Sequence, residues 1–502
     1  MSTTPSSDSQ IALRIQHGGE HNAHPRHAAV VLRPPQYNAS TVATRPQIVV
    51  MVMVVALPLL LLPILGARIV VTAVLAAVTL LYLVDLAFNA WVVTGIARRR
   101  RQDIRVEQTE HDWPLYTVLC PIYREAAVLP QFVRAMTDLD YPTDRLQIIL
   151  LLEEDDLETI GAARRLRLPQ HFETLVVPDS LPKTKPKACN EGLRRARGEF
   201  TVIFDTEDIP EPDQLKKAVR RFRASRGDVA CLQAPLNFYN PRQNTLTRLF
   251  TAEYTLWFDL LLEGLQDLRG PLPLGGTSNH FRTNVLIGLG GWDPYNVTED
   301  CDLGIRLYKQ GFRTGMLRST TYEEANPNLR NWIRQRSRWI KGYMQTFLVH
   351  SRGGWRRSDP HILTFSLVVG GKVLVNFINP IMWAVTLLYF VARSVVGPVI
   401  ESVYPPPLFY TALITLLLGN GLFVYTFLLG SAQRGNWDLV KYGLLAPVYW
   451  LAMSIAAVKA AWQLITRPFY WEKTHHGLHL STSTAEPVAQ VVRQALIEDQ
   501  AP

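Results

Sequence analysis

The chain has 502 residues, of which 48% are hydrophobic, and it carries a net charge of +9. It is too long for one small domain and too apolar in places for an ordinary soluble protein, so we expect a membrane protein with a sizeable globular part. Many basic residues flank apolar segments, as in ARRRRQDIR (97–105), which favours cytoplasmic anchoring at a membrane and argues against nucleic-acid binding. The 4 cysteines form no CxxC pair, so neither a zinc site nor a disulfide framework is indicated.

Two apolar runs follow an N-terminal tail. Residues 1–46 are rich in Ser, Thr, His, Pro and Arg without periodicity, which is typical of a disordered tail. The runs 48–66 and 69–95 are each long enough to cross the ~30 Å hydrocarbon layer of a bilayer, and only two residues separate them. We therefore predict a tight transmembrane hairpin over 47–97, and the arginines at 98–101 place both of its ends in the cytoplasm.

Residues 112–350 have the pattern of a soluble α/β domain. Short apolar runs at 115–123, 146–156 and 199–208 are separated by helical stretches such as VLPQFVRAMTDL (128–139). This alternation predicts a mostly parallel sheet, and ligands bind beyond the carboxyl ends of the strands in such sheets. Two of these three strands end in carboxylate clusters, so the sequence predicts a binding site at that edge.

The membrane pattern resumes over residues 361–465. Candidate spans or interfacial helices lie at 361–392, 408–430 and 439–465. The first of them is too long for a single straight crossing and short for two, so the number of crossings stays open. Residues 466–502 form a C-terminal segment.

Three polar segments of the α/β region have residue types suited to catalysis. FDTED offers Asp205, Glu207 and Asp208 just past a strand, where carboxylates can share a hard divalent cation with substrate phosphates. KTKPKACNEG (183–192) offers three lysines suited to a diphosphate. PYNVTEDCDLGIRL (294–307) offers acidic residues at a helix start. A solvated turn, a basic loop and helix capping are the respective alternatives.

A fourth segment, QRSRW (335–339), is basic and aromatic. Taken alone it is compatible with an amphipathic helix on an anionic membrane surface. Together with the other segments, however, it resembles a signature of the membrane-integrated family 2 glycosyltransferases, which include cellulose, hyaluronan, chitin and mannan synthases. That signature is an early acidic pair, a D-x-D-type metal motif, a T-E-D motif and Q-x-x-R-W, matched here at 153–156, 205–207, 298–300 and 335–339.

The resemblance implies an α/β GT-A fold, with a Rossmann-like mixed and mostly parallel sheet. This domain would be cytoplasmic and inserted between N- and C-terminal transmembrane helices, with interfacial amphipathic helices. The chain would be an integral protein of the bacterial inner or plasma membrane.

The resemblance also assigns donor contacts. It places Tyr123 and Glu125 of PIYRE near the base and ribose of a nucleotide sugar. Glu153 or Glu154 would help to read the base, and Lys187 would contact the donor. A UDP-sugar is our preferred donor, while UDP-glucose, UDP-N-acetylglucosamine and GDP-mannose all stay open.

The metal and the base follow from the same resemblance. Asp205 would hold Mg²⁺ or Mn²⁺ together with Glu207, which replaces the usual second aspartate and leaves Asp208 as a substitute ligand. Asp300 of T-E-D, next to Glu299, would be the general base. It would remove a proton from an acceptor hydroxyl that attacks C1 from the face opposite the diphosphate, giving a β-linked product.

Two segments would face the acceptor and the diphosphate. They contribute Ser278, Asn279, Gln335, Arg336, Arg338 and Trp339. Trp339 would stack on the acceptor sugar, while Gln335 and Arg338 approach the acceptor and the diphosphate.

WEKTHHG (471–477) resembles the gating loop of processive members of the family. Trp471 and Thr474 match its spacing, and His476 stands where a lysine is usual. An interfacial aromatic anchor is the alternative. Three crossings after a cytoplasmic domain would leave this loop outside, so either residues 361–396 contribute no net crossing or the gating interpretation is wrong.

Three functions fit these observations. The first is inverting transfer of sugar to a growing β-linked polysaccharide, coupled to export through the membrane helices. The second is non-processive transfer of one sugar to a membrane lipid. The third is a catalytically silent membrane scaffold or transporter. The partners are accordingly a nucleotide-sugar donor, a polysaccharide or lipid acceptor, and the lipid bilayer.

Overall fold

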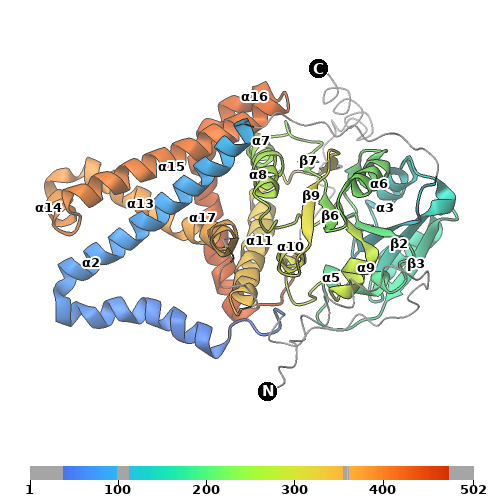
Figure 1. Cartoon of the computed structure of the whole chain (residues 1–502), viewed down its shortest axis with the longest axis horizontal. Helices are drawn as coiled ribbons and strands as arrows, with labels where there is room; N and C mark the ends of the chain where they lie inside the picture. Colours follow the sequence, from blue (N-terminus) through green and yellow to red (C-terminus); the bar gives the residue numbers. More distant parts are fainter. Residues whose placement is uncertain (1–37, 99–111, 354–358, 360, 474–502) are drawn as a thin grey trace.

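The computed structural model of the chain describes residues 38–98, 112–353, 359 and 361–473. It has a helical half and an α/β half, which lie side by side in Figure 1. The helical half is built from α2 (Arg45–Arg98), α13 (Lys372–Val391), α14 (Arg393–Val403) and α15 (Pro406–Gln433). Residues 1–37 of the predicted tail, the basic residues 99–101, Thr474 and His476 lie outside the described residues.

Helix α2 has two arms that meet at Gly66. This residue has a φ of 78°, a conformation that glycine adopts without steric cost. The first arm leads away from the α/β half and the second leads back to it (Figure 1). The turn of the predicted hairpin is therefore a glycine just before Ala67.

Four helical stretches of the described chain are long and apolar enough to cross a membrane. They are Arg45–Val93, His361–Val391, Pro406–Ala432 and Trp437–Thr466. Side chains of the first arm of α2, such as Val54 at 69% exposure, contact little other protein, which suits a lipid environment. Membrane crossing by these helices stays a prediction.

The α/β half is organised around a seven-stranded sheet. Its strands are β1 (Tyr116–Ile122), β2 (Leu146–Glu153), β3 (Phe172–Val177), β4 (Phe200–Ile203), β6 (Val229–Gln233), β8 (Asn279–Arg282) and β9 (Arg313–Met316). Their order is β3-β2-β1-β4-β8-β6-β9, and β8 runs antiparallel to both of its neighbours. The other pairings are parallel, which confirms the predicted mixed and mostly parallel sheet.

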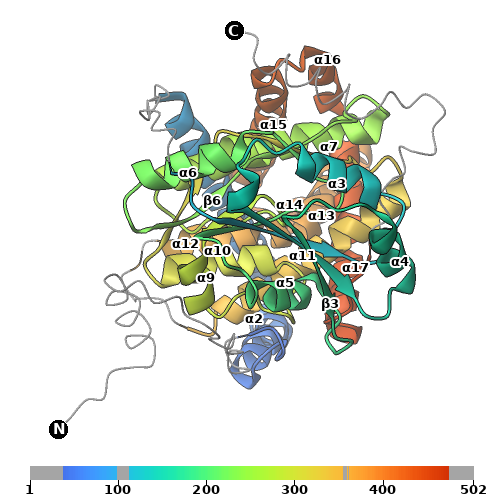
Figure 2. The same cartoon turned by 90° about the vertical axis from the view of Figure 1, so that its right-hand side faces the viewer.

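Helices cover both faces of this sheet. Figure 2 shows α3 (Leu129–Thr137) and α6 (Gln214–Ala224) on one face, and α5 (Lys185–Leu193) and α9 (Thr283–Gly288) on the other. Leu150 packs with the first pair and Leu151 with the second. Every residue of β2 is buried, which explains its continuous apolar run.

The remaining elements are a second, smaller sheet and further helices. A small sheet of order β5-β10-β7 contains β5 (Ile209–Pro210), β7 (Leu236–Phe238) and β10 (Thr321–Glu323). The remaining helices are α4 (Leu157–Arg165), α7 (Thr245–Thr255), α8 (Leu262–Asp267), α10 (Glu299–Lys309), α11 (Leu329–His350), α12 (His361–Phe365), α16 (Trp437–Val440) and α17 (Ala446–Thr466).

Helices α11 and α17 pack along one another at the junction of the two halves. Ile340 of α11 is buried against Ala456, Ala457 and Ala460 of α17. Figure 1 shows α17 running transverse to α15, rather than parallel to it as a neighbouring span would. Residues 467–473, which follow α17, lie against α11 and the loop after β1.

The number of membrane crossings stays open, because Trp437–Thr466 and His361–Val391 are both long and apolar enough to span. Residues 361–391 form a continuous helical stretch that includes a π-helical segment, Ser366–Gly371. Pro380 lies inside α13 without ending it.

Candidate active site

A cavity of about 350 Å³ lies at the junction of the two halves. Its wall on the α/β side includes Lys185, Asp205, Glu207, Glu299, Asp300 and Glu323. Its other residues from the predicted motifs are Gln335, Arg336, Arg338, Trp339 and Trp471. Segments that are far apart in the sequence thus meet around one space.

Lys185 and Asp205 form an ion pair at the cavity wall. Lys185 Nζ lies 2.5 Å from Asp205 Oδ1 and donates a hydrogen bond to the carbonyl of Gly276 at 2.8 Å. Burial alone would lower the pKa of Lys185, but the carboxylates of Asp205 and Glu299 outweigh it and the pKa is raised. Lys185 is therefore a permanent cation in the cavity.

Lys187 and Glu153 do not line the cavity. Lys187 Nζ lies 3.2 Å from Glu153 Oε2 and also donates to the carbonyl of Pro178 at 2.8 Å. Burial raises the pKa of Glu153, and Lys187 partly offsets this effect. Lys187 and Glu153 thus pair with each other, and Lys185 is the lysine of this segment that lines the cavity. Donor contacts of Lys187 and Glu153 stay a prediction.

Tyr123 contacts a different carboxylate from the two that were expected near the base. Its hydroxyl donates to Asp155 at 3.1 Å, and Asp155 also pairs with Lys183 at 2.7 Å. Lys183 lowers the pKa of Asp155, so this carboxylate is ionised. Glu154 instead accepts a hydrogen bond from the backbone of Asp179 at 3.0 Å. The sequence of the acidic run 153–156 does not indicate which of its carboxylates lies beside Tyr123, and the structure shows that it is Asp155.

Glu125 connects the loop after β1 to the FDTED loop after β4. It accepts a hydrogen bond from the hydroxyl of Thr206 at 2.5 Å, and Lys473 Nζ lies 3.4 Å from its carboxylate. Glu125 therefore fixes the loop after β1 relative to the loop after β4.

Asp208 is a buried support for the FDTED loop. It accepts hydrogen bonds from the backbone of Asp205 at 2.6 Å and from the hydroxyl of Thr277. Burial and the neighbouring Asp205 raise its pKa well above the usual range. Both bonds end on Oδ2, and Asp208 is absent from the cavity wall, so its role as a substitute metal ligand stays a prediction.

Asp205 and Glu207 are the two carboxylates of this loop that line the cavity. Oxygen ligands of this kind suit Mg²⁺ or Mn²⁺. Across the described ranges, no group of three or more His, Cys, Asp or Glu residues is arranged to hold a metal. A cation held by Asp205 and Glu207 would therefore complete its coordination with oxygens of a substrate or water, and the residues present fit that role.

Glu299 and Asp300 open helix α10 and face the same cavity. Burial raises the pKa of Asp300 to about 6. Burial and the neighbouring Asp300 raise the pKa of Glu299 to about 8. A Cβ on Gly276 would lie 3.4 Å from Asp300 Oδ2, so the glycine lets the backbone approach this carboxylate closely. Asp300 is the member of the pair that is ionised at neutral pH.

The two arginines of QRSRW have different surroundings. The half-buried Arg338 is attracted to Glu299, Asp300 and Asp205, and its guanidinium lies 4.6 Å from the ring centroid of Trp471. Arg338 therefore faces the acidic side of the cavity.

Arg336 instead supports the wall. It pairs with Glu253, and its guanidinium lies 4.6 Å from the ring of Trp339 and 4.4 Å from that of Phe250. The Tyr449 hydroxyl lies 3.2 Å from the same guanidinium. Arg336 lines the cavity, but its main contacts fix Trp339 and α17.

Comparison with known proteins agrees with this geometry. Residues 114–342 match the family described as "Glycosyltransferase like family 2". We call this matched region, residues 114–342, the glycosyltransferase domain. The match ends within α11, three residues after the tryptophan of QRSRW.

Two curated proteins are similar over this glycosyltransferase domain. The chain is 27% identical over 233 residues to "Probable glycosyltransferase YdaM" of Bacillus subtilis (strain 168), which covers 46% of this chain and 55% of that protein. It is 28% identical over 240 residues to "Cellulose synthase 2" of Novacetimonas hansenii, which covers 47% of this chain and 15% of that protein. The chain thus matches about half of the first relative and a small part of the second.

A solved structure confirms the fold of the domain. The mannosyltransferase PcManGT from Pyrobaculum calidifontis, in complex with GDP-Man and Mn²⁺, superposes with a TM-score of 0.50 at 17% identity. The superposition covers 79% of this chain and 99% of that one. The glycosyltransferase domain therefore has the predicted GT-A fold.

Ser278 and Asn279 of the glycosyltransferase domain lie outside the cavity wall. The hydroxyl of Ser278 donates to that of Thr321 at 2.7 Å, and the amide of Asn279 donates to the carbonyl of Gly275. Both side chains are buried because β8 begins at Asn279. The residues of this segment that line the cavity are 274–277, and acceptor contacts of Ser278 and Asn279 stay a prediction.

The cavity extends from the glycosyltransferase domain into the helical half. Its polar lining there comprises Tyr82, Asp85, Asn89, Lys372, Asn376, Asn379 and Asn420. These residues belong to α2, α13 and α15. Sequence reasoning missed them, together with Glu253 and Glu323, because each is an isolated polar residue outside the recognised motifs.

Proposed function

We propose that the chain transfers a sugar from a nucleotide-sugar donor to a hydroxyl of a growing β-linked polysaccharide, with inversion at C1. The observation that carries the proposal is the meeting of Asp205, Asp300 and Arg338 at one cavity that continues between the membrane-length helices. A UDP-sugar is the preferred donor.

Asp300 is assigned as the general base. Its pKa of about 6 leaves it ionised at neutral pH, whereas Glu299, with a pKa of about 8, retains its proton. Because the pKa values of these two adjacent carboxyl groups differ, one can be ionised while the other stays protonated in the same site. Asp300 accepts the proton of the acceptor hydroxyl, and that oxygen forms the bond to C1 as the bond to the diphosphate breaks. A positioned base of this kind contributes ~10²–10⁴-fold to the rate.

The diphosphate is assigned to the cationic side of the cavity. Lys185 and Arg338 both face it and would balance the charge of the leaving group. Asp205 and Glu207 would hold Mg²⁺ or Mn²⁺, which supplies Lewis-acid stabilisation when bound. Tyr123 and Asp155, which bond each other beyond the cavity wall, would contact the nucleoside, and Glu125 would hold the loop after β1 that carries Tyr123.

The acceptor is assigned to the part of the cavity between the helices. Amide, carboxyl and ammonium groups at membrane depth are costly unless they face a polar ligand or one another. Tyr82, Asn379 and Asn420 bond one another, and they can also hydrogen-bond a hydroxyl-rich chain. Apolar side chains of the same lining, such as Leu86 and Leu422, suit a sugar ring or an acyl chain. The polar groups support a polysaccharide acceptor, and the product analysis below distinguishes it from a lipid acceptor.

The proposal places the chain in a bacterial inner or plasma membrane, with the glycosyltransferase domain in the cytoplasm. Four helical stretches of sufficient length and apolarity support a membrane location. The side is supported by the basic residues that follow the second arm of α2 in the sequence.

The test uses purified protein in lipid nanodiscs. It is incubated separately with UDP-glucose, UDP-N-acetylglucosamine and GDP-mannose, with Mg²⁺ or Mn²⁺, and the product is sized and linkage-mapped. We expect a β-linked polymer from one donor and none from the Asp300→Asn variant. A glycolipid carrying one sugar would select the lipid acceptor instead. If none of the three donors gives a transferred product, the proposal is overturned for these donors.

A further inference from the structure

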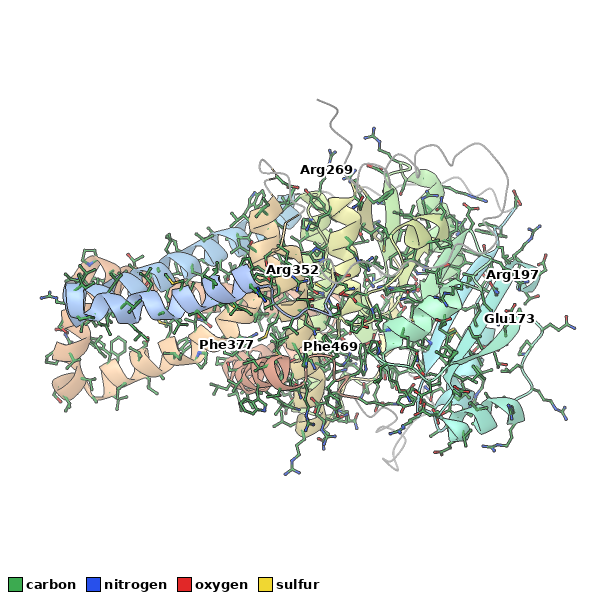
Figure 3. The ribbon with its side chains drawn as sticks, turned by 90° about the horizontal axis from the view of Figure 1, so that it is seen from below. Glu173, Arg197, Arg269, Arg352, Phe377 and Phe469 are labelled. Atoms are coloured by element: carbon green, nitrogen blue, oxygen red, sulfur yellow. The ribbon has the colours of Figure 1, made fainter. Side chains whose placement is uncertain are left out.

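The segment after α17 forms a strap across the cavity edge. We call residues 467–473 the C-terminal strap. Lys341 Nζ donates to the carbonyl of Tyr470 at 2.7 Å, and Gln345 Nε2 donates to the carbonyl of Pro468 at 3.1 Å. Figure 3 labels Phe469 at the junction between the helical and α/β halves. The strap is therefore held by two side chains one turn apart on α11.

The far end of the strap reaches the donor side of the site. Lys473 Nζ donates to the backbone carbonyls of Tyr123 and Arg124, and it lies 3.4 Å from the carboxylate of Glu125. Trp471 lies over Arg338 and lines the cavity. The strap thus contacts the loop after β1, which carries Tyr123, and it contacts Arg338, which faces the acidic residues of the cavity.

The loop that carries the base rests on the same part of α11. We call residues 293–300 the base loop. The backbone N–H of Val297 donates to Gln345 Oε1 at 3.1 Å, and Asn296 Nδ2 donates to Thr346 Oγ1 at 2.9 Å. A Cβ on Gly342 would overlap the side chain of Thr298, so the base loop lies directly against the helix.

Gln345 is the side chain that joins these two segments. Its oxygen accepts from the base loop and its nitrogen donates to the strap, while only 1% of the residue is exposed. Next to it, the rings of Tyr295 and Phe469 make an edge contact with centroids 5.4 Å apart. A buried amide with both ends bonded holds its two partners in a fixed relation, because losing either bond leaves a polar group unsatisfied.

We propose that Gln345 is a positioning residue that couples the seating of the C-terminal strap to the placement of Asp300. When the strap is seated, Lys473 contacts the loop after β1 and Trp471 contacts Arg338. Its bond to Gln345 then also fixes the backbone of Val297, three residues before the general base Asp300. The inference rests on the proposed function, since it assigns Asp300 as the base.

A double-mutant cycle tests the coupling. Gln345→Leu removes both bonds, and Lys473→Met removes the distal anchor of the strap. Each change is expected to lower kcat about tenfold, and the double variant is expected to be no slower than the slower single variant. The donor KM of Gln345→Leu should change by less than about threefold, because Gln345 does not touch the donor. Multiplication of the two single effects to about a hundredfold would overturn the coupling.

Gln147→Leu is the matched control. Gln147 is also 1% exposed and bonds Thr117 at 2.8 Å and the backbone of Arg197 at 3.0 Å. Figure 3 shows Arg197 at the end of the α/β half that is remote from the helical half. This variant is expected to lower Tm while leaving kcat unchanged.

Gln345→Glu covers the case in which Gln345→Leu fails to fold. It keeps an acceptor for the N–H of Val297 but offers no amide donor to Pro468, so a loss of kcat in a folded protein would still support the coupling. Full activity of folded Gln345→Glu would contradict it. Activity of Asp300→Asn would instead contradict the proposed function, so the two failures are distinguishable.

Discussion

Lys185 and Asp205 face each other across 2.5 Å at the wall of the junction cavity. Lys185 opens helix α5, and Asp205 follows strand β4, so the pair joins two elements of the GT-A fold at the carboxyl edge of its sheet. A binding site at this edge needs cationic and anionic groups together, because a nucleotide diphosphate and a divalent cation would occupy it jointly.

The first prediction separates two neighbouring lysines. Lys185→Met should lower kcat by about 10²-fold or more, since it removes a cation from the cavity where leaving-group charge develops. Lys187→Met should instead destabilise the fold by about 3–5 kcal/mol, because it leaves the buried Glu153 without its partner. Steady-state kinetics and Tm of both variants check this. If both variants fold and lose turnover equally, the two lysines do not have the separate roles predicted here.

The second prediction concerns pH. Asp300 has a pKa of about 6 and acts as a base only when ionised. Turnover should therefore rise with pH through about 6 and fall about tenfold per pH unit below it. A kcat profile over about pH 5 to 8 checks this, with donor binding measured in parallel. A flat profile across that range would contradict the assignment of the base.

The third prediction contrasts the two arginines of QRSRW. Arg338→Met should reduce turnover with little loss of stability, because Arg338 faces Glu299 and Asp300 across the cavity. Arg336→Met should lower Tm, since it leaves Glu253 unpaired and removes support from Trp339. Thermal unfolding and product formation measured on the same preparations distinguish the two. Loss of the folded state in Arg338→Met would show that its role is structural.

The fourth prediction concerns Trp339. Its indole lines the cavity and is held by Arg336. Aromatic faces suit the apolar face of a sugar ring, so Trp339→Ala should impair transfer to the acceptor more than donor binding. Donor affinity measured by calorimetry and transfer measured with an exogenous acceptor give the two quantities. A larger loss of donor affinity than of transfer would place Trp339 on the donor side.

The strand-end motifs were predictable because parallel topology brings strand ends to one edge. FDTED follows β4, and the acidic run 153–156 begins at the end of β2, as the apolar runs indicated. The choice between Lys185 and Lys187 was not predictable, because it depends on where α5 begins and which way its first turn faces. Likewise, the burial of Ser278 and Asn279 depends on β8, which begins at Asn279 and pairs between β4 and β6.

The role of α17 could not be derived from hydropathy. Its sequence is apolar enough for a span, but its buried alanines pack on Ile340 of α11. Small residues allow close packing of two helices, and this pairing is a tertiary property absent from any local pattern. The polar residues Asn376 and Asn420 were missed for a related reason, since only the fold brings them to one cavity.

The most direct test of the account is the Asp300→Asn variant. Asparagine keeps the shape of the side chain but cannot accept the proton of the acceptor hydroxyl. With the active donor and metal, we expect product formation to fall by about 10²–10⁴-fold while donor affinity stays within about threefold of that of the unsubstituted protein. Transfer at the unsubstituted rate by the folded variant would contradict the assignment of Asp300 and, with it, the proposed mechanism.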